Sequence, residues 1–549
     1  MPEPTEKEEF IIMHTNPRAR ALLIIIGFLL LAGTPVQSAM MPVFLGAGGN
    51  NSPNATTIQV LTRHSSTIFN EMEDAFKSST YAPSGDIDII FRAFDAAQWP
   101  TTIAQGDIDL AWGGGPTLFD EQMTRGNLRA ITETAILTEI ADMNTTYWQG
   151  PPVGTIAGSP MYRYSGGDLM WVGSAIASFG FTVNEFELEN RGLPAPTKWE
   201  HLAHPNYYRD TPAIAIGNAP DTTSNTRIYE IILQHYGWDL GWAVLTMMGG
   251  NSVVKTGSTE VLVAVEDGDV AIGTTIDFYG YEAELEYEGN RYILPEGQSI
   301  VNADPIAFTT STHGDSARNE LAAAFMHFVL SDEGQAVLLA DQIKRMPIRT
   351  DAFDEAATDS NKHFVTELRT LYERTLDNIG IDFNDSLALS YENTMMEYQS
   401  ATIYDAHTEL RQAAKAIAQA WKDNRSSEAQ LYLIAMDLGD PIITEAEAQS
   451  INDQIGDDQT FKESKVSEWR TAAKDKYAQV RNAAAALIYN ATPPGYEQIP
   501  ANNPFALGGE DFTATVSKKE AAFGFRLLPA LFGLSILGLV LIMKRRRWA

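Results

Sequence analysis

Three short loops carry residue types suited to hold a small, oxygen-rich ligand. Each loop joins the end of an expected strand to the start of an expected helix and is built of Ser, Thr, Gly or basic residues. Helix N-termini present unpaired N–H groups and a partial positive charge, which attract anions. The candidate ligand-binding residues of these loops are Arg63, His64, Ser65, Ser66, Trp112, Gly113, Gly114, Gly115, Thr223, Ser224 and Asn225. Ordinary helix capping is the alternative for each loop taken alone.

A fourth candidate segment follows the strand expected near Ala271. It contains Asp277 and Tyr279, whose carboxylate and phenol suit an amine, sugar hydroxyls or a metal. A strand end with packed aromatic side chains is the alternative. Because ligands gather at the carboxyl ends of strands in open α/β sheets, we expect all four segments to face one shared cleft.

The common catalytic motifs are missing from the sequence or match it by coincidence. No Cys is present, which rules out disulfides, thiolate metal sites and Cys nucleophiles. No P-loop and no H-E-x-x-H zinc motif occurs. The S-x-x-K match at 252–255 and the K-T-G match at 255–257 share one Lys, whereas penicillin-recognising enzymes keep them apart. His201 and His204 are expected on a solvated helix face. The sequence therefore predicts a binding protein without catalytic residues, cofactor or resident metal.

Short strands and helices alternate up to about residue 349. A helix is expected over 65–78, where apolar residues share one face. The expected strands are 58–61, 87–91, 108–112 and segments near Ile214, Val261 and Ala271. This alternation is typical of a parallel α/β sheet.

The strands stop near residue 354, and apolar residues then recur at helical spacing to about residue 490. Thr444 and Glu447 form a T-x-x-E capping box, which marks the start of a helix. We therefore expect a helical extension at 351–490, followed by a Pro- and Gly-rich tether at 491–526.

Both ends of the chain carry apolar runs flanked by basic residues. The run at 21–33 has the length of a signal-peptide core, so we expect 1–45 to be a cytoplasmic N-terminus with either a cleaved signal peptide or an uncleaved signal anchor. The run at 527–543 would be about 25 Å long as a helix, the short end of a membrane span. The basic tail 544–549 marks the cytoplasmic side. The bulk of the chain, beginning with a linker at 46–57, is thus expected to be extracellular.

The charge of the chain fits an exposed extracellular surface. Lys plus Arg number 39 and Asp plus Glu number 71, which gives a net charge of −32. Such a charge repels the phosphates of nucleic acids and excludes a general nucleic-acid-binding role. Six Asn-X-Ser/Thr sequons lie in the outside part, beginning at Asn50, Asn54, Asn144, Asn384, Asn424 and Asn490.

Six stretches of the sequence follow one another in a family-specific order. They are IQVLTRHSSTIFNEMEDAF (58–76), GDIDLAWGGGPTLFDEQMTRGNL (106–128), SFGFTVNEFELENRGLPAPTKWEHLAHPNYYRD (178–210), GDVAIGTTIDFYGY (268–281), VNADPIAFTTSTHG (301–314) and AFMHFVLSDEGQAVL (324–338). This order resembles that of extracellular solute-binding proteins of ABC importers, in the group that contains ferric-iron-binding proteins. No single motif is decisive, but the ordered set is fairly specific, above all LPAPTKWEHLAHP and FVLSDEGQ.

The resemblance implies an α/β, two-lobed fold of the periplasmic-binding-protein type II class over 57–350. Lobe 1 would comprise about 57–135 and 300–350, and lobe 2 about 136–299. In this family the lobes close on a ligand like a hinge, and the closed form docks on a membrane permease driven by a separate ATPase. The complete expectation adds the C-terminal helical extension and the terminal transmembrane helices to this fold.

The resemblance also bears on the ligand. Ferric-binding members use two adjacent tyrosines late in the second lobe, and the corresponding positions here hold Phe278 and Tyr279. Phe cannot ligate a metal, so the sequence favours an anion-bearing organic solute over Fe³⁺. We expect a membrane-tethered solute-binding component of an ABC-type importer, with a small solute, a permease and its ATPase as partners. The alternatives are a ligand-binding sensor ectodomain acting with a partner chain and an extracellular hydrolase.

Overall fold

The computed structural model describes residues 55–488, apart from residues 95, 151, 312–314, 379 and 424–427. The expected terminal segments 1–45, 491–526, 527–543 and 544–549 lie outside these residues, as do most of the linker 46–57 and the sequons at Asn50, Asn54, Asn424 and Asn490. Within the described part of the chain, no helix has both the length and the apolar composition that a membrane span needs.

The first lobe is built on a mainly parallel sheet. Strand β1 (Thr56–Thr62) pairs in parallel with β2 (Ile87–Ala93) and β3 (Leu110–Trp112). Its other elements are a 3₁₀ turn η3 (Ala96–Gln98), helices α1 (Ser66–Ser78), α2 (Trp99–Ala104), α3 (Pro116–Thr124), α4 (Thr134–Thr146), α11 (Ser316–Leu330) and α12 (Asp332–Val337), and the short strands β4 (Thr155–Ile156), β5 (Ser159–Pro160) and β6 (Tyr162–Ser165). The strands expected at 58–61, 87–91 and 108–112 are confirmed.

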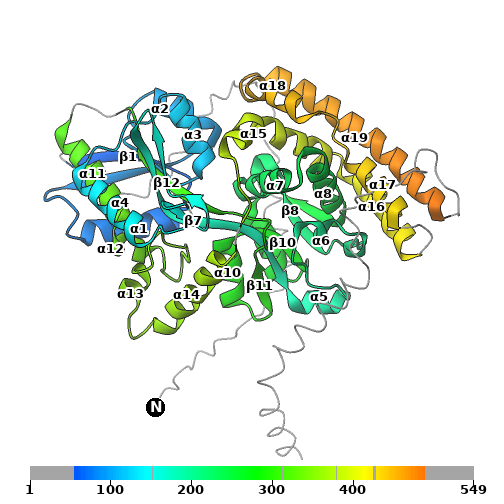
Figure 1. The fold of residues 1–549 in the computed structure, drawn as a ribbon, viewed down its shortest axis with the longest axis horizontal. Helices are drawn as coiled ribbons and strands as arrows, with labels where there is room; N and C mark the ends of the chain where they lie inside the picture. The colour runs from blue at the N-terminus through cyan, green and yellow to red at the C-terminus, as the bar shows by residue number, and fades with distance from the viewer. Residues whose placement is uncertain are drawn as a thin grey trace, which may run out of the picture. The chain divides into compact units, whose positions relative to one another are not determined.

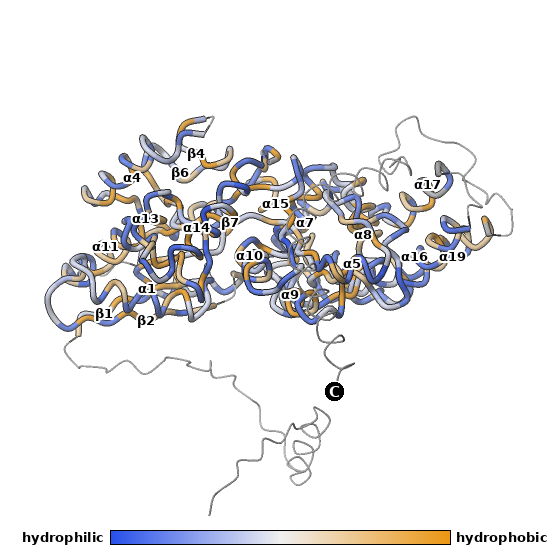
Figure 2. The backbone as a smooth tube through the Cα atoms, turned by 90° about the horizontal axis from the view of Figure 1, so that it is seen from below, coloured by the Kyte–Doolittle hydropathy of each residue, from blue (hydrophilic) through white to orange (hydrophobic). Residues whose placement is uncertain are grey.

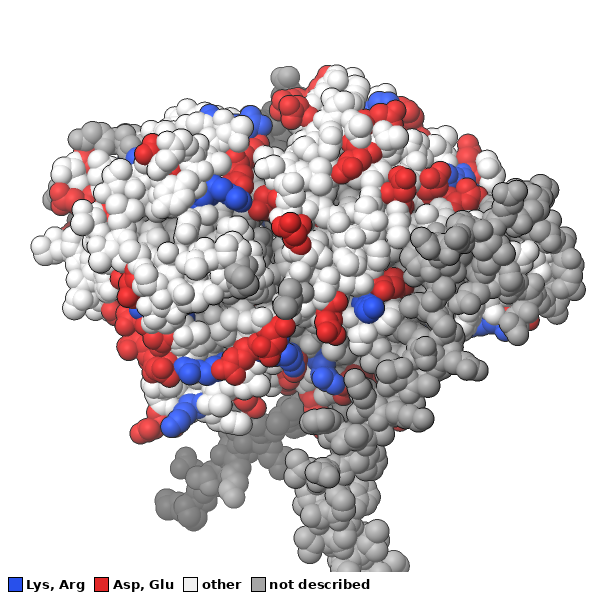
Figure 3. All heavy atoms as spheres, in the orientation of Figure 1, with Lys and Arg blue, Asp and Glu red and all other residues white. Residues whose placement is uncertain are grey.

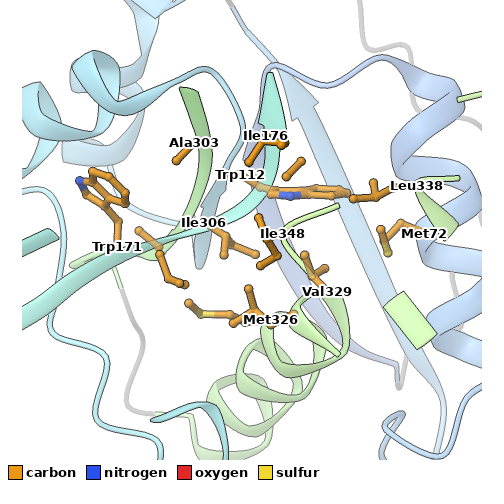
Figure 4. Close-up of a cluster of buried hydrophobic side chains, with 14 of the residues drawn as sticks. Met72, Trp112, Trp171, Ile176, Ala303, Ile306, Met326, Val329, Leu338 and Ile348 are labelled. Atoms are coloured by element: carbon orange, nitrogen blue, oxygen red, sulfur yellow. The ribbon is translucent and has the colours of Figure 1, made fainter. Parts of the chain in front are cut away.

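The core of the first lobe lies between this sheet and the helices α1 and α11. The buried Trp112 ends β3, and Met72 of α1 and Val329 of α11 lie around it (Figure 4). Burying a side chain of this apolar kind stabilises the fold by about 1.5–3 kcal/mol. The core therefore fixes the end of β3, where the glycine-rich loop begins.

The second lobe repeats the parallel arrangement. Strand β8 (Ile214–Gly217) pairs in parallel with β10 (Ile272–Ile276) and β9 (Ser252–Lys255). Its other elements are β11 (Asn290–Ile293), the 3₁₀ turns η4 (Pro205–Tyr207) and η5 (Ala219–Asp221), and helices α5 (Glu185–Arg191), α6 (Trp199–Ala203), α7 (Thr223–Tyr236), α8 (Trp238–Asn251), α9 (Ser258–Glu266) and α10 (Asp277–Glu286). The strands expected near Ile214 and Ala271 are confirmed.

Two strands run from one lobe into the other. Strand β7 (Asp168–Asn184) pairs antiparallel with β12 (Val301–Phe308) through residues 172–178 and with β10 through residues 179–183 (Figure 1). The register of β12 shifts between Asp304 and Pro305, where Pro has no N–H to donate. A few such residues are the kind of connection about which two lobes rotate.

The two hydrophobic clusters divide within β7. Residues of β7 up to Ile176 belong to the first cluster, and residues from Ala177 belong to the second. Trp148 packs in the first cluster and donates from its indole N–H to Ile348 O at 2.9 Å. The segment 136–176 thus packs with the first lobe, whereas the sequence places the boundary near residue 135.

Residues from 352 to 488, where described, form helices joined by short loops, without a strand. They are α13 (Ala352–Ala356), α14 (Lys362–Leu376), α15 (Asp385–Gln399), a π-helical turn (Ser400–Tyr404), α16 (His407–Lys422), α17 (Glu428–Gly439), α18 (Glu445–Asp457) and α19 (Gln459–Ile488). Apolar residues recur along α8, α16 and α19, which pack together (Figure 2). The capping box is confirmed, because Thr444 accepts from the N–H of Glu447 and Glu447 accepts from that of Thr444.

Two expectations from the sequence are wrong. Val261 lies in α9, not in a strand, because it packs with Val265 of the same helix against Ala215 of the sheet. A short apolar run does not distinguish a strand from a buried helix by its periodicity. His201 is buried, not solvated, and its Nδ1 accepts from the N–H of Thr197 at 3.1 Å.

Candidate functional site

The four candidate segments meet between the lobes, in a region here called the interlobe junction. Each of the three loops leads from a strand to a helix as expected, from β1 to α1, from β3 to α3 and from β8 through η5 to α7. The junction is defined by Arg63, His64, Gly113, Gly114, Gly115, Thr117, Thr223, Ser224, Asn225, Arg227, Asp277, Phe278, Tyr279, Asp304 and Arg345.

The glycine loop adopts a backbone that only glycine takes easily. Gly113, Gly114 and Gly115 have φ of 77°, 115° and 87°. A Cβ on Gly113 would lie 2.6 Å from His64 Nε2, and one on Gly114 would lie 2.9 Å from Arg63 Cγ. The glycines are therefore required both for the turn and for the close approach of the loop after β1.

Arg63 joins the first lobe to the second. Its Nη1 donates to Phe94 O at 3.1 Å, and its Nη2 donates to Thr223 Oγ1 at 2.6 Å. Thr223 is the first residue of α7, so the guanidinium lies at the N-terminus of a second-lobe helix. This contact holds the two lobes together through one side chain.

His64 is a buried, neutral side chain. It is 6% exposed, and its ring lies 4.4 Å from that of Trp112, centroid to centroid. Burial and the nearby Arg345 lower the pKa of His64 well below its ordinary value. Its buried Nε2 has no hydrogen-bond partner among the described residues.

Arg345 and Asp304 form a buried ion pair at the centre of the junction. The two side chains are 6% and 5% exposed, and Arg345 Nη2 contacts Asp304 Oδ2. Asp304 Oδ1 also accepts the N–H of Gly114 at 3.2 Å, and the guanidinium lies 5.0 Å from the Phe278 ring centroid. Burial lowers the pKa of Arg345, and Asp277 and Tyr279 oppose that shift. The pair thus connects the glycine loop to the fourth segment.

Asp277 faces this arginine from the second lobe. Its Oδ2 accepts from Ser178 N at 2.7 Å and from Ser178 Oγ at 3.3 Å, and its Oδ1 accepts from Phe278 N at 2.8 Å. Burial raises the pKa of Asp277 to about 6, and Arg345 opposes the shift. Tyr279 OH lies 3.1 Å from Thr259 Oγ1.

The remaining candidates divide into exposed and buried groups. Ser65 and Ser66 are exposed, and Ser65 makes no side-chain cap to α1. Trp112 is a core residue that donates to Ser174 Oγ at 3.0 Å, and Asn225 Oδ1 accepts from Gly217 N at 3.0 Å. Ser224 Oγ lies 2.8 Å from Ser258 Oγ. Binding by any of these side chains remains a prediction.

Two arginines of the junction were missed from the sequence. Arg227 is 7% exposed, and its Nη2 donates to Thr117 Oγ1 in the first lobe. Arg345 follows Lys344 in a mostly apolar stretch, and a basic pair in such a stretch is the signal that could have identified it. Arg227 gave no such signal, because its contacts with Thr117 and Asp385 join residues that are distant in sequence.

Three arginines lie at the junction of this acidic protein, and two of them are paired with buried carboxylates. Asp and Glu outnumber Lys and Arg over the face shown in Figure 3, whereas Arg63, Arg227 and Arg345 converge between the lobes. Guanidinium groups and helix N-termini both suit oxyanions. Among the described residues, no three His, Asp or Glu side chains are grouped to hold a metal ion.

Part of the two-lobed region matches a family model directly. Residues 160–373 match the model of the bacterial extracellular solute-binding protein family. This segment is an extracellular solute-binding domain. The resemblance seen in the sequence is thereby confirmed. The helices that follow residue 373 lie beyond this match.

The solute-binding domain also has curated relatives. The chain is 25% identical over 305 residues to the phosphoglycerate transport regulatory protein PgtC of Salmonella typhimurium. The aligned region covers 54% of this chain and 70% of the relative. The protein of the same name from Salmonella typhi matches to the same extent. By their names these relatives act in transport.

Solved structures similar to this chain include a periplasmic binding protein. Iron-bound HitA of Pseudomonas aeruginosa is 18% identical and covers 58% of this chain and 99% of its own, with a TM-score of 0.43. AfuA of Actinobacillus pleuropneumoniae, solved with exogenous fructose-6-phosphate bound, is 15% identical and covers 59% and 98%, with a TM-score of 0.42.

Proposed function

We propose that this chain captures an anion-bearing organic solute between its two lobes and delivers it to an ABC permease and its ATPase. The observation that carries the proposal is the convergence of three arginines, two of them in buried pairs, at the junction of a solute-binding domain. Arginine binds carboxylate and phosphate with paired, charge-assisted hydrogen bonds. An Fe³⁺ cargo is less favoured, because Phe278 stands beside Tyr279.

A phosphorylated three-carbon acid is the first solute to test. The name of the relative PgtC refers to phosphoglycerate transport, and phosphoglycerate carries both a phosphate and a carboxylate. Its two anionic groups would suit a junction with arginines on both sides. The word "regulatory" in that name also favours the second candidate function, a sensor ectodomain that acts with a partner chain.

Tethering to the membrane is part of the proposal. The apolar run 527–543 with its basic tail would anchor the domain beside the permease, and 491–526 would serve as the tether. A short flexible tether raises the effective concentration of the binder to about the millimolar range. The domain itself would then act outside the cell.

A thermal-shift panel on the full chain tests this function. The panel contains phosphoglycerate, fructose 6-phosphate, an alkylphosphonate, a polyamine and ferric citrate. A solute present at a hundredfold excess over its Kd stabilises the folded state by about 2.7 kcal/mol. We expect a phosphorylated acid or sugar to raise the melting temperature. Turnover of a phosphate ester with no shift from any solute would contradict import and favour a hydrolase.

A matched pair of variants places the solute at the junction. Arg63→Gln removes the guanidinium between the lobes, whereas Arg125→Gln removes one from a surface ion pair in which Arg125 is 49% exposed. The first variant is expected to weaken the shift and the second to leave it unchanged. Equal effects would place the solute elsewhere.

A further inference from the structure

The helical extension reaches the interlobe junction through the start of α15. Asp385 is the first residue of that helix, and it lies beyond the segment that matches the solute-binding family. Its side chain is 13% exposed and contacts residues of both lobes. No role for this extension follows from the two-lobed fold itself.

On the first lobe, Asp385 is held by two side chains. Its Oδ1 accepts from Thr117 Oγ1 of α3 at 3.2 Å, and its Oδ2 accepts from Arg163 Nη2 of β6 at 3.2 Å. The same guanidinium also contacts Asp120 Oδ2 at 2.9 Å. The extension is therefore anchored to the lobe that carries the glycine loop.

On the second lobe, the contact passes through α7. Asp385 Oδ1 lies 3.8 Å from Arg227 Nη1. The preceding residue, Asn384, accepts at its carbonyl from Gln234 Nε2 at 3.0 Å and donates from its N–H to Gln234 Oε1 at 2.8 Å. Both lobes thus bind the same turn of chain at the start of α15.

Arg227 is the side chain on which these contacts converge. Its Nη2 donates to Thr117 Oγ1 and would lie 3.8 Å from a Cβ on Gly115, while its Nη1 lies 3.0 Å from Glu230 Oε2. Burial lowers the pKa of Arg227, but Glu230 and Asp385 more than offset this and raise it. The cation is thereby kept beside the glycine loop.

We propose that Asp385 is a positioning residue that braces the two lobes and holds Arg227 against the glycine loop. The brace biases the solute-free chain towards its closed arrangement, because opening the lobes separates Asp385 from Thr117 and Arg163 or from Arg227. This inference rests on the proposed function only in taking closure of the lobes as the step that captures a solute. The brace itself is a property of the chain without solute.

A distance measurement without solute tests the brace. The sequence has no Cys, so two introduced cysteines are the only labelling sites. Asp74→Cys in α1 and Glu189→Cys in α5 place spin labels on exposed positions of the two lobes. Pulsed electron–electron resonance on the full chain then gives the distribution of interlobe distances.

The informative variant is Asp385→Asn, and Asp382→Asn is its matched control on an exposed carboxylate three residues away. Loss of a charge-assisted contact is expected to shift the ratio of open to closed chains by about tenfold towards the longer distances. The control should keep the wild-type distribution. Unchanged distances in a folded Asp385→Asn chain would overturn the proposal, as would an equal shift in the control.

A second variant covers the case in which Asp385→Asn fails to fold. Thr117→Val removes only the hydroxyl that lies between Arg227 and Asp385, and it is expected to lengthen the distances in the same direction. Unchanged distances in this variant would then overturn the brace. If the panel of solutes finds no ligand but the variants open the lobes, the proposed function fails and the brace stands. If a solute binds but the distances stay unchanged in the variants, the proposed function stands and the brace fails.

Discussion

Replacing Arg345 by Met is expected to lower the free energy of unfolding by about 3–5 kcal/mol. Arg345 and Asp304 are 6% and 5% exposed, and they contact each other directly. Removing one partner of such a pair leaves the other charge buried and uncompensated, which costs more than the pair itself contributes. Asp277 loses its opposing cation at the same time, so its pKa should rise further above about 6.

Urea unfolding followed by Trp fluorescence measures this loss. The double variant Arg345→Met with Asp304→Asn should recover a large part of the lost stability, because the amide oxygen of the new Asn side chain still accepts from Gly114 N without carrying charge. The deficit of the single variant should shrink at pH 5, where the buried carboxylates take up protons more readily. Arg125→Met, in a surface pair, should cost less than about 1 kcal/mol. A loss below about 1 kcal/mol for Arg345→Met would refute the reasoning.

Three further outcomes can be measured on the same chain. Burial lowers the pKa of His201 to about 4, so the neutral ring contributes to the free energy of unfolding fully above about pH 6.5, and this contribution is lost as the pH falls through 4. His201→Gln should therefore flatten that part of the acid-unfolding curve. An unchanged curve would contradict this. Gly113 has a φ of 77°, and a Cβ added to it would lie 2.6 Å from His64 Nε2, so Gly113→Ala should lower the free energy of unfolding by about 1–3 kcal/mol in a thermal melt. Unchanged stability would mean that the loop relaxes freely. Thr444→Ala should cost about 1 kcal/mol by loss of the capping box, and retention of full stability would show that the cap is dispensable.

Local patterns predicted the loops well, because they depend on residues close in sequence. The alternation of strand, polar loop and helix placed Arg63, Gly114 and Thr223 at strand ends, and contacts between Arg63 and Thr223 bring two of those ends together. The capping box at Thr444 was equally local. Helical periodicity likewise predicted the extension.

Long-range pairing is what the sequence could not reveal. Asp304 and Arg345 form a buried pair although they lie far apart along the chain, and Arg227 meets Thr117 and Asp385 only in the fold. Nothing in the sequence singled out Asp385, and only the fold brings Arg163 and Thr117 to it. The packing of 136–176 with the first lobe depends on the pairing of β7 with β12, two strands that lie far apart in sequence.

Hydrogen–deuterium exchange tests the central claim, that one solute is held between the lobes by loops from both. The full chain is compared with and without the phosphorylated solute that raises its melting temperature. The account predicts that exchange slows together in three loops, 62–66 and 112–117 of the first lobe and 221–226 of the second. Protection confined to one lobe, or located away from all three loops, would contradict it.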